Sequence, residues 1–85
     1  MELPEEITSD LLRRLARIEG QVRGVQALLR DGRGCREVVT QLSAVGKAID
    51  QVGFKMLSTC LTNPELARAS GVGLDELERL FLKLA

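Results

Sequence analysis

The stretch GCREVVTQLSAVGKAIDQVGFKMLSTC, from Gly34 to Cys60, contains both cysteines of the chain and no proline. Its apolar or small residues recur in alternating steps of three and four, at Cys35, Val38, Leu42, Val45, Ile49, Val52 and Met56. This spacing is the heptad pattern of a helix with one apolar edge. It predicts one long helix over about residues 34–61, with a thiol near each end.

The two thiols lie too far apart to meet within such a helix. Cys35 and Cys60 are 25 residues apart, which places them on nearly the same face but roughly 37 Å apart along the axis. A disulfide requires Cα atoms within about 7 Å of each other. If two copies pack antiparallel, with the two-fold axis near Lys47 and Ala48, Cys35 lies beside Cys60 of the partner subunit, and a symmetric dimer has two identical dithiol sites. The alternative is two ordinary buried thiols, which pack like small apolar side chains.

A second heptad pattern precedes this stretch, at Leu11, Leu15, Ile18, Val22, Val25 and Leu29. It predicts a first helix over about residues 10–30, after a loose acidic tail over residues 1–9. Asp31 and Gly32 are typical of a helix end and a short turn, so the two helices are expected to fold back as an antiparallel hairpin.

After a break at Pro64, one or two helical turns are predicted over Glu65–Ala69. A third, shorter helix is expected over about residues 74–84. The chain is therefore predicted to be a single all-α domain over residues 1–85, with a three-helix protomer. The long second helix is apolar on two edges, and the 85 residues include only two aromatic side chains. A core of this kind is hard to close within one small chain, so oligomerisation is expected.

Composition argues against several classes of function. The chain has no histidine, which removes the commonest general base and metal ligand. It also has no nucleophile–base set and no glycine-rich phosphate loop, so an enzyme is not expected. No signal peptide or long apolar segment is present, which predicts a soluble, cytoplasmic protein without a membrane partner. In that reducing compartment, two cysteines are expected to sense, to bind metal or to be inert.

Basic charge is concentrated in one part of a chain with zero formal net charge. Residues 11–36 carry seven arginines and only two acidic residues. Arg13, Arg14 and Arg17 fall on adjacent turns of the first predicted helix, away from its apolar edge. The planar arginine fork suits phosphate, so this surface predicts contact with nucleic acid. The alternative is an ordinary solvated face.

Two segments resemble the copper-sensing repressor family, which also includes nickel/cobalt, formaldehyde and persulfide sensors. RLARIEGQVRG over residues 14–24 resembles that family's RLxRIxGQxxGI stretch, and CREVVTQLSAV over residues 35–45 resembles its CxDVxxQIxAV stretch. The resemblance extends from the first helix through Leu61. It implies a three-helix protomer, a dimer that forms a four-helix bundle around antiparallel second helices, and a dimer of dimers.

The resemblance also implies a transcriptional repressor. Such a protein binds operator double-stranded DNA on its basic face and releases the DNA when an inducer occupies a site between protomers. Arg14 matches a DNA-contact position of the family most directly, and Arg13, Arg17 and Arg23 complete the predicted DNA-binding set. The competing hypothesis is a structural helical oligomer with inert thiols that does not bind DNA.

The predicted sensing site differs from the family's known patterns. Copper sensors use cysteine, then histidine 25 residues later, then cysteine after four more; here Cys35, Cys60 and Pro64 occupy these positions. Persulfide sensors keep cysteine at the first and third positions, and formaldehyde sensors have proline where this chain has Glu2. Two chemistries therefore stay open. Either Cu(I) is held by Cys35 and Cys60 of the partner subunit, or Cys35 attacks an oxidant or persulfide and the partner's Cys60 resolves the product.

Overall fold

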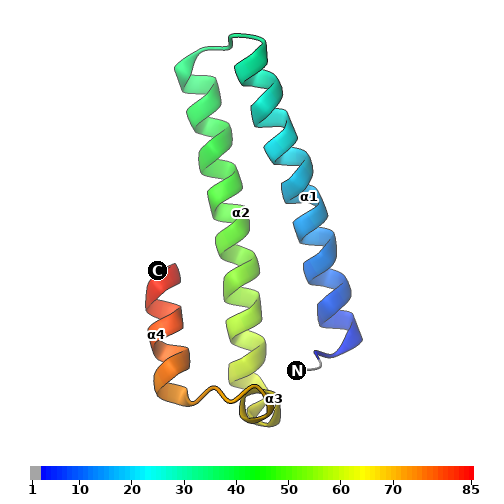
Figure 1. Ribbon diagram of the computed structural model, residues 1–85, viewed down its shortest axis with the longest axis vertical. Coiled ribbons are helices and arrows are strands. Elements are labelled where there is room, and N and C mark those ends of the chain that lie inside the picture. The colour runs from blue at the N-terminus through cyan, green and yellow to red at the C-terminus, as the bar shows by residue number, and fades with distance from the viewer. Residues whose placement is uncertain (1–2) are drawn as a thin grey trace.

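The computed structural model describes residues 3–85, which form four α-helices and no strand (Figure 1). They are α1 (Glu5–Arg30), α2 (Cys35–Thr62), α3 (Pro64–Ala69) and α4 (Leu74–Leu84). The long antiparallel hairpin of α1 and α2 confirms the predicted all-α fold. Helix α3 lies where one or two helical turns were predicted over Glu65–Ala69, and it makes a fourth helix beside the predicted three, because Pro64 starts a new helical turn directly after α2.

Helix α1 begins five residues before its predicted start. The predicted loose tail over residues 1–9 is wrong from Glu5 onward, while its first two residues lie outside the described part of the chain. The C=O of Pro4 accepts a hydrogen bond from the N–H of Ile7 at 3.0 Å, which closes the first turn. Glu5 and Glu6 lie in that turn, where carboxylates interact favourably with the helix dipole. The start was missed because α1 has no side-chain cap to mark it.

The turn between α1 and α2 is closed by backbone hydrogen bonds. Gly32 has a φ of +67°, a left-handed conformation that favours glycine. Its N–H donates to the C=O of Leu29 at 3.2 Å, and the N–H of Arg33 donates to the C=O of Leu28 at 3.0 Å. These two bonds form a Schellman motif, which satisfies carbonyl groups at the end of α1 and reverses the chain.

The hairpin buries only half of each heptad pattern. The buried half comprises Leu11, Ile18, Val25, Val38 and Val45. The alternate positions, which we call the open apolar face, are between 42% and 62% exposed: Leu15, Val22, Leu29, Leu42 and Ile49. Each member of the open apolar face follows a buried residue by four positions, which rotates it by about 40° from the helix contact. Because α1 and α2 are antiparallel, this rotation turns both rows toward the same side of the hairpin.

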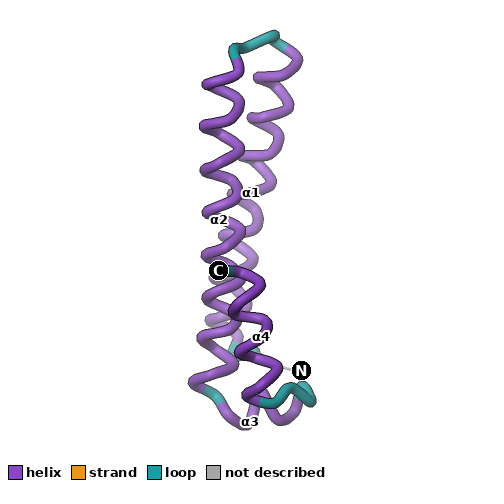
Figure 2. Tube along the Cα trace, turned by 90° about the vertical axis from the view of Figure 1, so that its left-hand side faces the viewer, coloured by secondary structure: helices purple, strands orange, loops and turns teal. Residues whose placement is uncertain are grey.

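The protomer is one helix layer thick. Its Cα atoms extend over 49 × 26 × 15 Å, and α2 lies between α1 and α4 (Figures 1 and 2). A single layer leaves the faces of its helices uncovered, whereas stable domains pack two or more layers around a core. None of the helices over residues 3–85 is both long enough and apolar enough to cross a membrane.

A second core lies at the end of α2 that is farthest from the hairpin turn. Its buried members are Leu57, Cys60, Leu66 and Leu77. The rings of Phe54 and Phe81 have centroids 5.5 Å apart. At Gly53, an added Cβ would lie 2.8 Å from a methyl carbon of Leu84, so the end of α4 sits close against the α2 backbone. Helices α3 and α4 therefore cover one end of α2 and leave the other end open.

Candidate functional site

Cys35 is exposed and is the first residue of α2. It shares the heptad position of Leu42 and Ile49, so it lies at the turn end of the open apolar face. The nearby Arg33 donates from Nε to Glu37 Oε2 at 3.0 Å, so its positive charge is paired with a carboxylate of the same chain. The predicted thiol is thus available to solvent and to any chain that covers the open apolar face.

Cys60 is buried beneath α3 and α4. Only 9% of it is exposed, and it packs in one cluster with Leu57, Leu66 and Leu77. It also lines an open pocket of about 350 Å³, whose lining includes a single charged residue, Arg68. The remaining lining residues are Leu61, Pro64, Val72, Gly73, Leu74 and Leu77. The second predicted thiol therefore has apolar surroundings contributed by α2, α3 and α4.

One protomer does not bring the two thiols together. Both are free, and they lie near opposite ends of the 28-residue helix α2. Within residues 3–85, no cluster of three or more cysteine or carboxylate side chains could hold a metal ion. The donor set fits a soft ion such as Cu(I) in chemical type, because thiolates are its preferred ligands. Because the two thiols lie near opposite ends of α2, one ion can contact both kinds of thiol only between two chains.

The predicted DNA-binding arginines all lie on α1. Arg13, Arg17 and Arg23 are exposed, while Arg14 is half-buried. Arg14 donates from Nε to Asp10 Oδ2 at 2.9 Å, and Arg13 Nη2 lies 3.8 Å from Asp10 Oδ1. Asp10 was not among the predicted site residues, although its spacing of four residues from Arg14 is the signal for such a pair on a helix.

Arg14 lies on the opposite side of the hairpin from the open apolar face. It follows buried Leu11 by three positions, which rotates it by about 60° in the sense opposite to Leu15. Lys55 follows the half-buried Val52 on α2 by the same step and faces the same side. The hydrogen bond from Arg14, together with the positive charges of Arg14, Lys55 and Arg13, lowers the pKa of Asp10. The side opposite the open apolar face therefore carries a basic cluster around one carboxylate.

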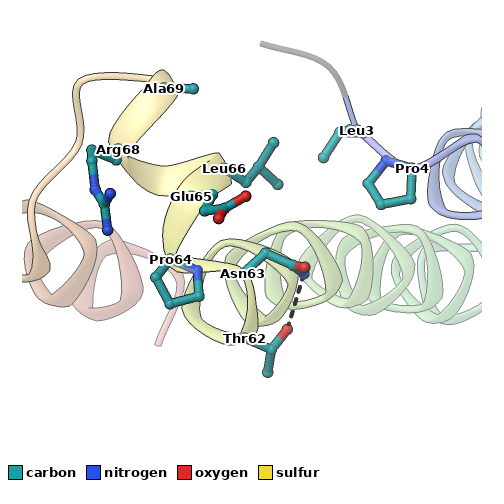
Figure 3. A pocket seen from close by; sticks show the side chains of 9 residues that line it. All are labelled: Leu3, Pro4, Thr62, Asn63, Pro64, Glu65, Leu66, Arg68 and Ala69. Carbon is teal, nitrogen blue, oxygen red and sulfur yellow. Dashed lines mark hydrogen bonds between the residues drawn. The ribbon is translucent and has the colours of Figure 1, made fainter.

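A larger open pocket of about 1020 Å³ lies where the start of the chain approaches α3 (Figure 3). Leu3 and Pro4 lie across the opening from Leu66 in this view. Asn63 Nδ2 donates to the C=O of Thr59 at 2.9 Å, so this amide is used within the chain. None of the predicted thiol or arginine residues lines this pocket, although it shares Pro64 and Arg68 with the pocket beside Cys60.

The chain is similar to known transcriptional regulators. A family described as "Metal-sensitive transcriptional repressor" matches residues 7–83. The copper-sensing transcriptional repressor RicR of Mycobacterium tuberculosis is 39% identical over 51 residues, which cover 60% of this chain and 53% of that protein. The copper-sensing transcriptional repressor CsoR of Bacillus subtilis is 46% identical over 44 residues, which cover 52% and 44%, respectively. The chain thus spans about half the length of these relatives, and no solved structure matches it.

Proposed function

Because this chain belongs to the metal-sensitive transcriptional repressor family, we propose that it represses transcription under the control of copper or of a thiol-reactive species. The family comprises transcriptional repressors and not enzymes, in agreement with the sequence-based prediction. In this proposal the protein works in the cytoplasm and binds operator double-stranded DNA through Arg14, Arg13, Arg17 and Arg23. It releases the DNA when an inducer occupies Cys35 and Cys60 of the partner subunit.

The open apolar face, with Cys35 at its end, is the observation that carries this proposal. Its five side chains are 42–62% exposed, and apolar surface gains about 25 cal/mol for every Å² removed from water. A second copy packed antiparallel over this face forms a four-helix bundle. A two-fold axis near Lys47 and Ala48 then places each Cys35 next to Cys60 of the partner subunit. Two such dimers form the tetramer that the family resemblance implies.

The surroundings of the two thiols assign them different roles in thiol chemistry. Exposed Cys35 reacts first: its thiolate attacks a polysulfide sulfur, keeps that sulfur as a persulfide and releases the shortened polysulfide. Cys60 of the partner subunit then attacks the Cys35 sulfur, which forms the interchain disulfide and releases hydrosulfide. In the copper alternative, Cys35 and Cys60 of the partner subunit would hold Cu(I) as thiolates, and the ion would supply a soft centre shared by the two subunits.

The position of the arginines makes DNA binding compatible with this dimer. Arg14 and Arg17 face away from the open apolar face, so a partner that covers that face leaves these arginines accessible. A change in the spacing between paired α2 helices also changes the spacing between the two arginine sets of a dimer. DNA is released if only one spacing matches the phosphates of the duplex, because the inducer then stabilises the other state.

DNA binding is tested with a duplex selected by the wild-type protein from a random-sequence pool. We expect the association constant to fall steeply with salt concentration, as it does when arginines displace counterions from phosphate. Arg14→Ala should weaken binding by roughly tenfold or more, as for the loss of charged contacts to phosphate. Arg79→Ala, which removes an exposed arginine of α4, is the matched control and should leave binding unchanged. Failure to select any duplex would favour the structural-oligomer hypothesis.

The inducer is tested by intact mass spectrometry of the reduced protein under denaturing conditions without reductant. After treatment with a polysulfide donor, a crosslinked dimer or a sulfur mass gain that requires both Cys35 and Cys60 indicates thiol sensing. Cys35→Ser and Cys60→Ser are the matched controls. An unchanged covalent mass excludes thiol sensing, and one tight Cu(I) equivalent per protomer in a native titration then selects copper.

A further inference from the structure

We propose that Asp10 is a built-in competitor of DNA phosphate: its carboxylate occupies Arg14 and weakens DNA binding by the repressor. The inference rests on the proposed DNA-binding function of Arg14 and assigns a new role to a neighbouring residue. Asp10 thereby sets the affinity for DNA without contacting a base.

The geometry of the pair places a carboxylate where a phosphate would bind. Arg14 donates from Nε to Asp10 Oδ2 at 2.9 Å, and the other oxygen, Oδ1, lies 3.8 Å from Arg13 Nη2. Arginine binds phosphate through two N–H groups of its planar fork, and Nε belongs to one of the two edges that can do so. The side chains of Arg14 and Asp10 are 39% and 30% exposed, respectively, so DNA can reach the pair. Arg14 must exchange its carboxylate for phosphate to use this edge.

Electrostatics act in the same direction. Asp10 faces Arg14 and Arg13 from its own helix and Lys55 from α2. Its negative charge therefore partly offsets the positive charge of three basic side chains. A phosphate bound to Arg14 also lies near the Asp10 carboxylate, and these like charges repel. Removal of the carboxylate charge is therefore expected to strengthen the interaction of the whole cluster with DNA.

Structural roles do not account for the pair. Helix α1 begins at Glu5, so Asp10 lies within the helix and is not its cap. The pair joins two solvent-accessible residues one turn apart on the same helix, and such pairs contribute little to stability. Asp10 can therefore be neutralised without loss of the fold.

The test compares Asp10→Asn with Glu37→Gln in binding to the selected duplex. Glu37 accepts from Arg33 at 3.0 Å with the same four-residue spacing, and Arg33 is not among the predicted DNA-binding residues. Both substitutions remove one negative charge per chain, so they have the same effect on net charge. We expect Asp10→Asn to bind about three- to tenfold more tightly, with a salt slope steeper by up to about 0.9 for each phosphate gained. Glu37→Gln should change affinity less than about twofold, as expected for a charge outside the contact surface.

Two further variants separate failure of this inference from failure of the proposed function. In the double variant Asp10→Asn/Arg14→Ala, the gain in affinity should disappear, because the arginine released by the substitution is absent. If wild-type protein binds DNA and Arg14→Ala weakens it, but Asp10→Asn matches Glu37→Gln or binds less tightly than wild type, the role of Asp10 is wrong. If wild-type protein shows no salt-dependent binding, or Arg14→Ala binds as wild type does, the proposed DNA surface fails and this inference with it.

Discussion

The two ends of α2 carry the same thiol in opposite surroundings. Cys35 starts the helix beside a short turn, where it is exposed. Cys60 lies near the other end, where it is only 9% exposed and packs with Leu66 of α3 and Leu77 of α4. The thiol at the start of α2 is therefore accessible to solvent, whereas the thiol near its other end is covered by two additional helices.

The difference follows from what comes after each end of the hairpin. At the turn, backbone hydrogen bonds around Gly32 reverse the chain at once, and α3 and α4 lie toward the opposite end of α2 (Figure 1). At the far end, Pro64 starts α3 and the chain returns as α4 beside α2 (Figure 1). A site built from Cys35 and Cys60 of the partner subunit would therefore combine one exposed thiol and one thiol covered by α3 and α4. Access to the covered thiol depends on how firmly α3 and α4 are packed.

The largest expected effect is a loss of stability when the packing around Cys60 is disrupted. Leu77→Ala removes the most deeply buried side chain of the Cys60 cluster, which is 3% exposed, and should lower the free energy of unfolding by about 2–5 kcal/mol. The control is Leu74→Ala on the same helix, where the side chain is 75% exposed; it should change stability by less than about 0.5 kcal/mol. Chemical denaturation measures both values. Equal effects at the two positions would contradict the packing of α4 on α2.

The reaction rates of the two thiols sharpen the comparison. We expect Cys35 to react with a maleimide reagent at least about tenfold faster than Cys60, because labelling of a buried thiol waits for local opening. Peptide mapping after timed quenching gives the two rates, and both thiols should react alike in denaturant. Leu77→Ala should accelerate labelling of Cys60 and leave Cys35 unchanged. A native Cys60 that reacts as fast as Cys35 would contradict its coverage by α3 and α4.

The turn between α1 and α2, next to Cys35, depends on a backbone conformation and not on side-chain packing. Gly32→Ala forces a side chain into a left-handed conformation with φ of +67°, which costs roughly 1–2 kcal/mol. Gly20→Ala on α1 is the control: its φ is not positive, and beyond its chain neighbours and the backbone of its own helix no described atom lies within 4 Å of an added Cβ. There alanine should stabilise the helix by about 0.5–1 kcal/mol. Thermal unfolding distinguishes these opposite signs, and stabilisation by Gly32→Ala would rule out the Schellman turn.

The smallest expected effect is a change in the free energy of unfolding at acid pH, which depends on the Asp10 carboxylate. The hydrogen bond from Arg14 lowers the pKa of Asp10 below 3.8, so the ionised carboxylate stabilises the folded state. This contribution is present above the unfolded pKa and is lost as the pH falls through the lowered, folded pKa. The difference in unfolding free energy between wild type and Asp10→Asn should therefore shrink below about pH 3.8. Circular dichroism melts across this range measure it, and a difference that grows in acid would contradict the assignment.

Local sequence signals account for most of the helices. The heptad patterns and the Asp31–Gly32 signal predicted the hairpin, because side-chain periodicity and glycine conformations are local properties. The start of α1 at Glu5 was missed, since a helix that begins without a side-chain cap leaves only a weak signal in its first turn. The Asp10–Arg14 pair was also missed, although its spacing was visible in the sequence.

The sequence by itself determined that α1 and α2 each have an apolar edge and that the two cysteines lie near opposite ends of one helix. Only the tertiary structure decided which half of each heptad is buried, because periodicity sets the rotation of a side chain but not the number of helices that pack against it. Leu15 and Leu11 belong to the same pattern, yet only Leu11 is buried. Cys35 and Cys60 differ for the same reason: burial depends on contacts with α3 and α4, which lie outside the repeating pattern.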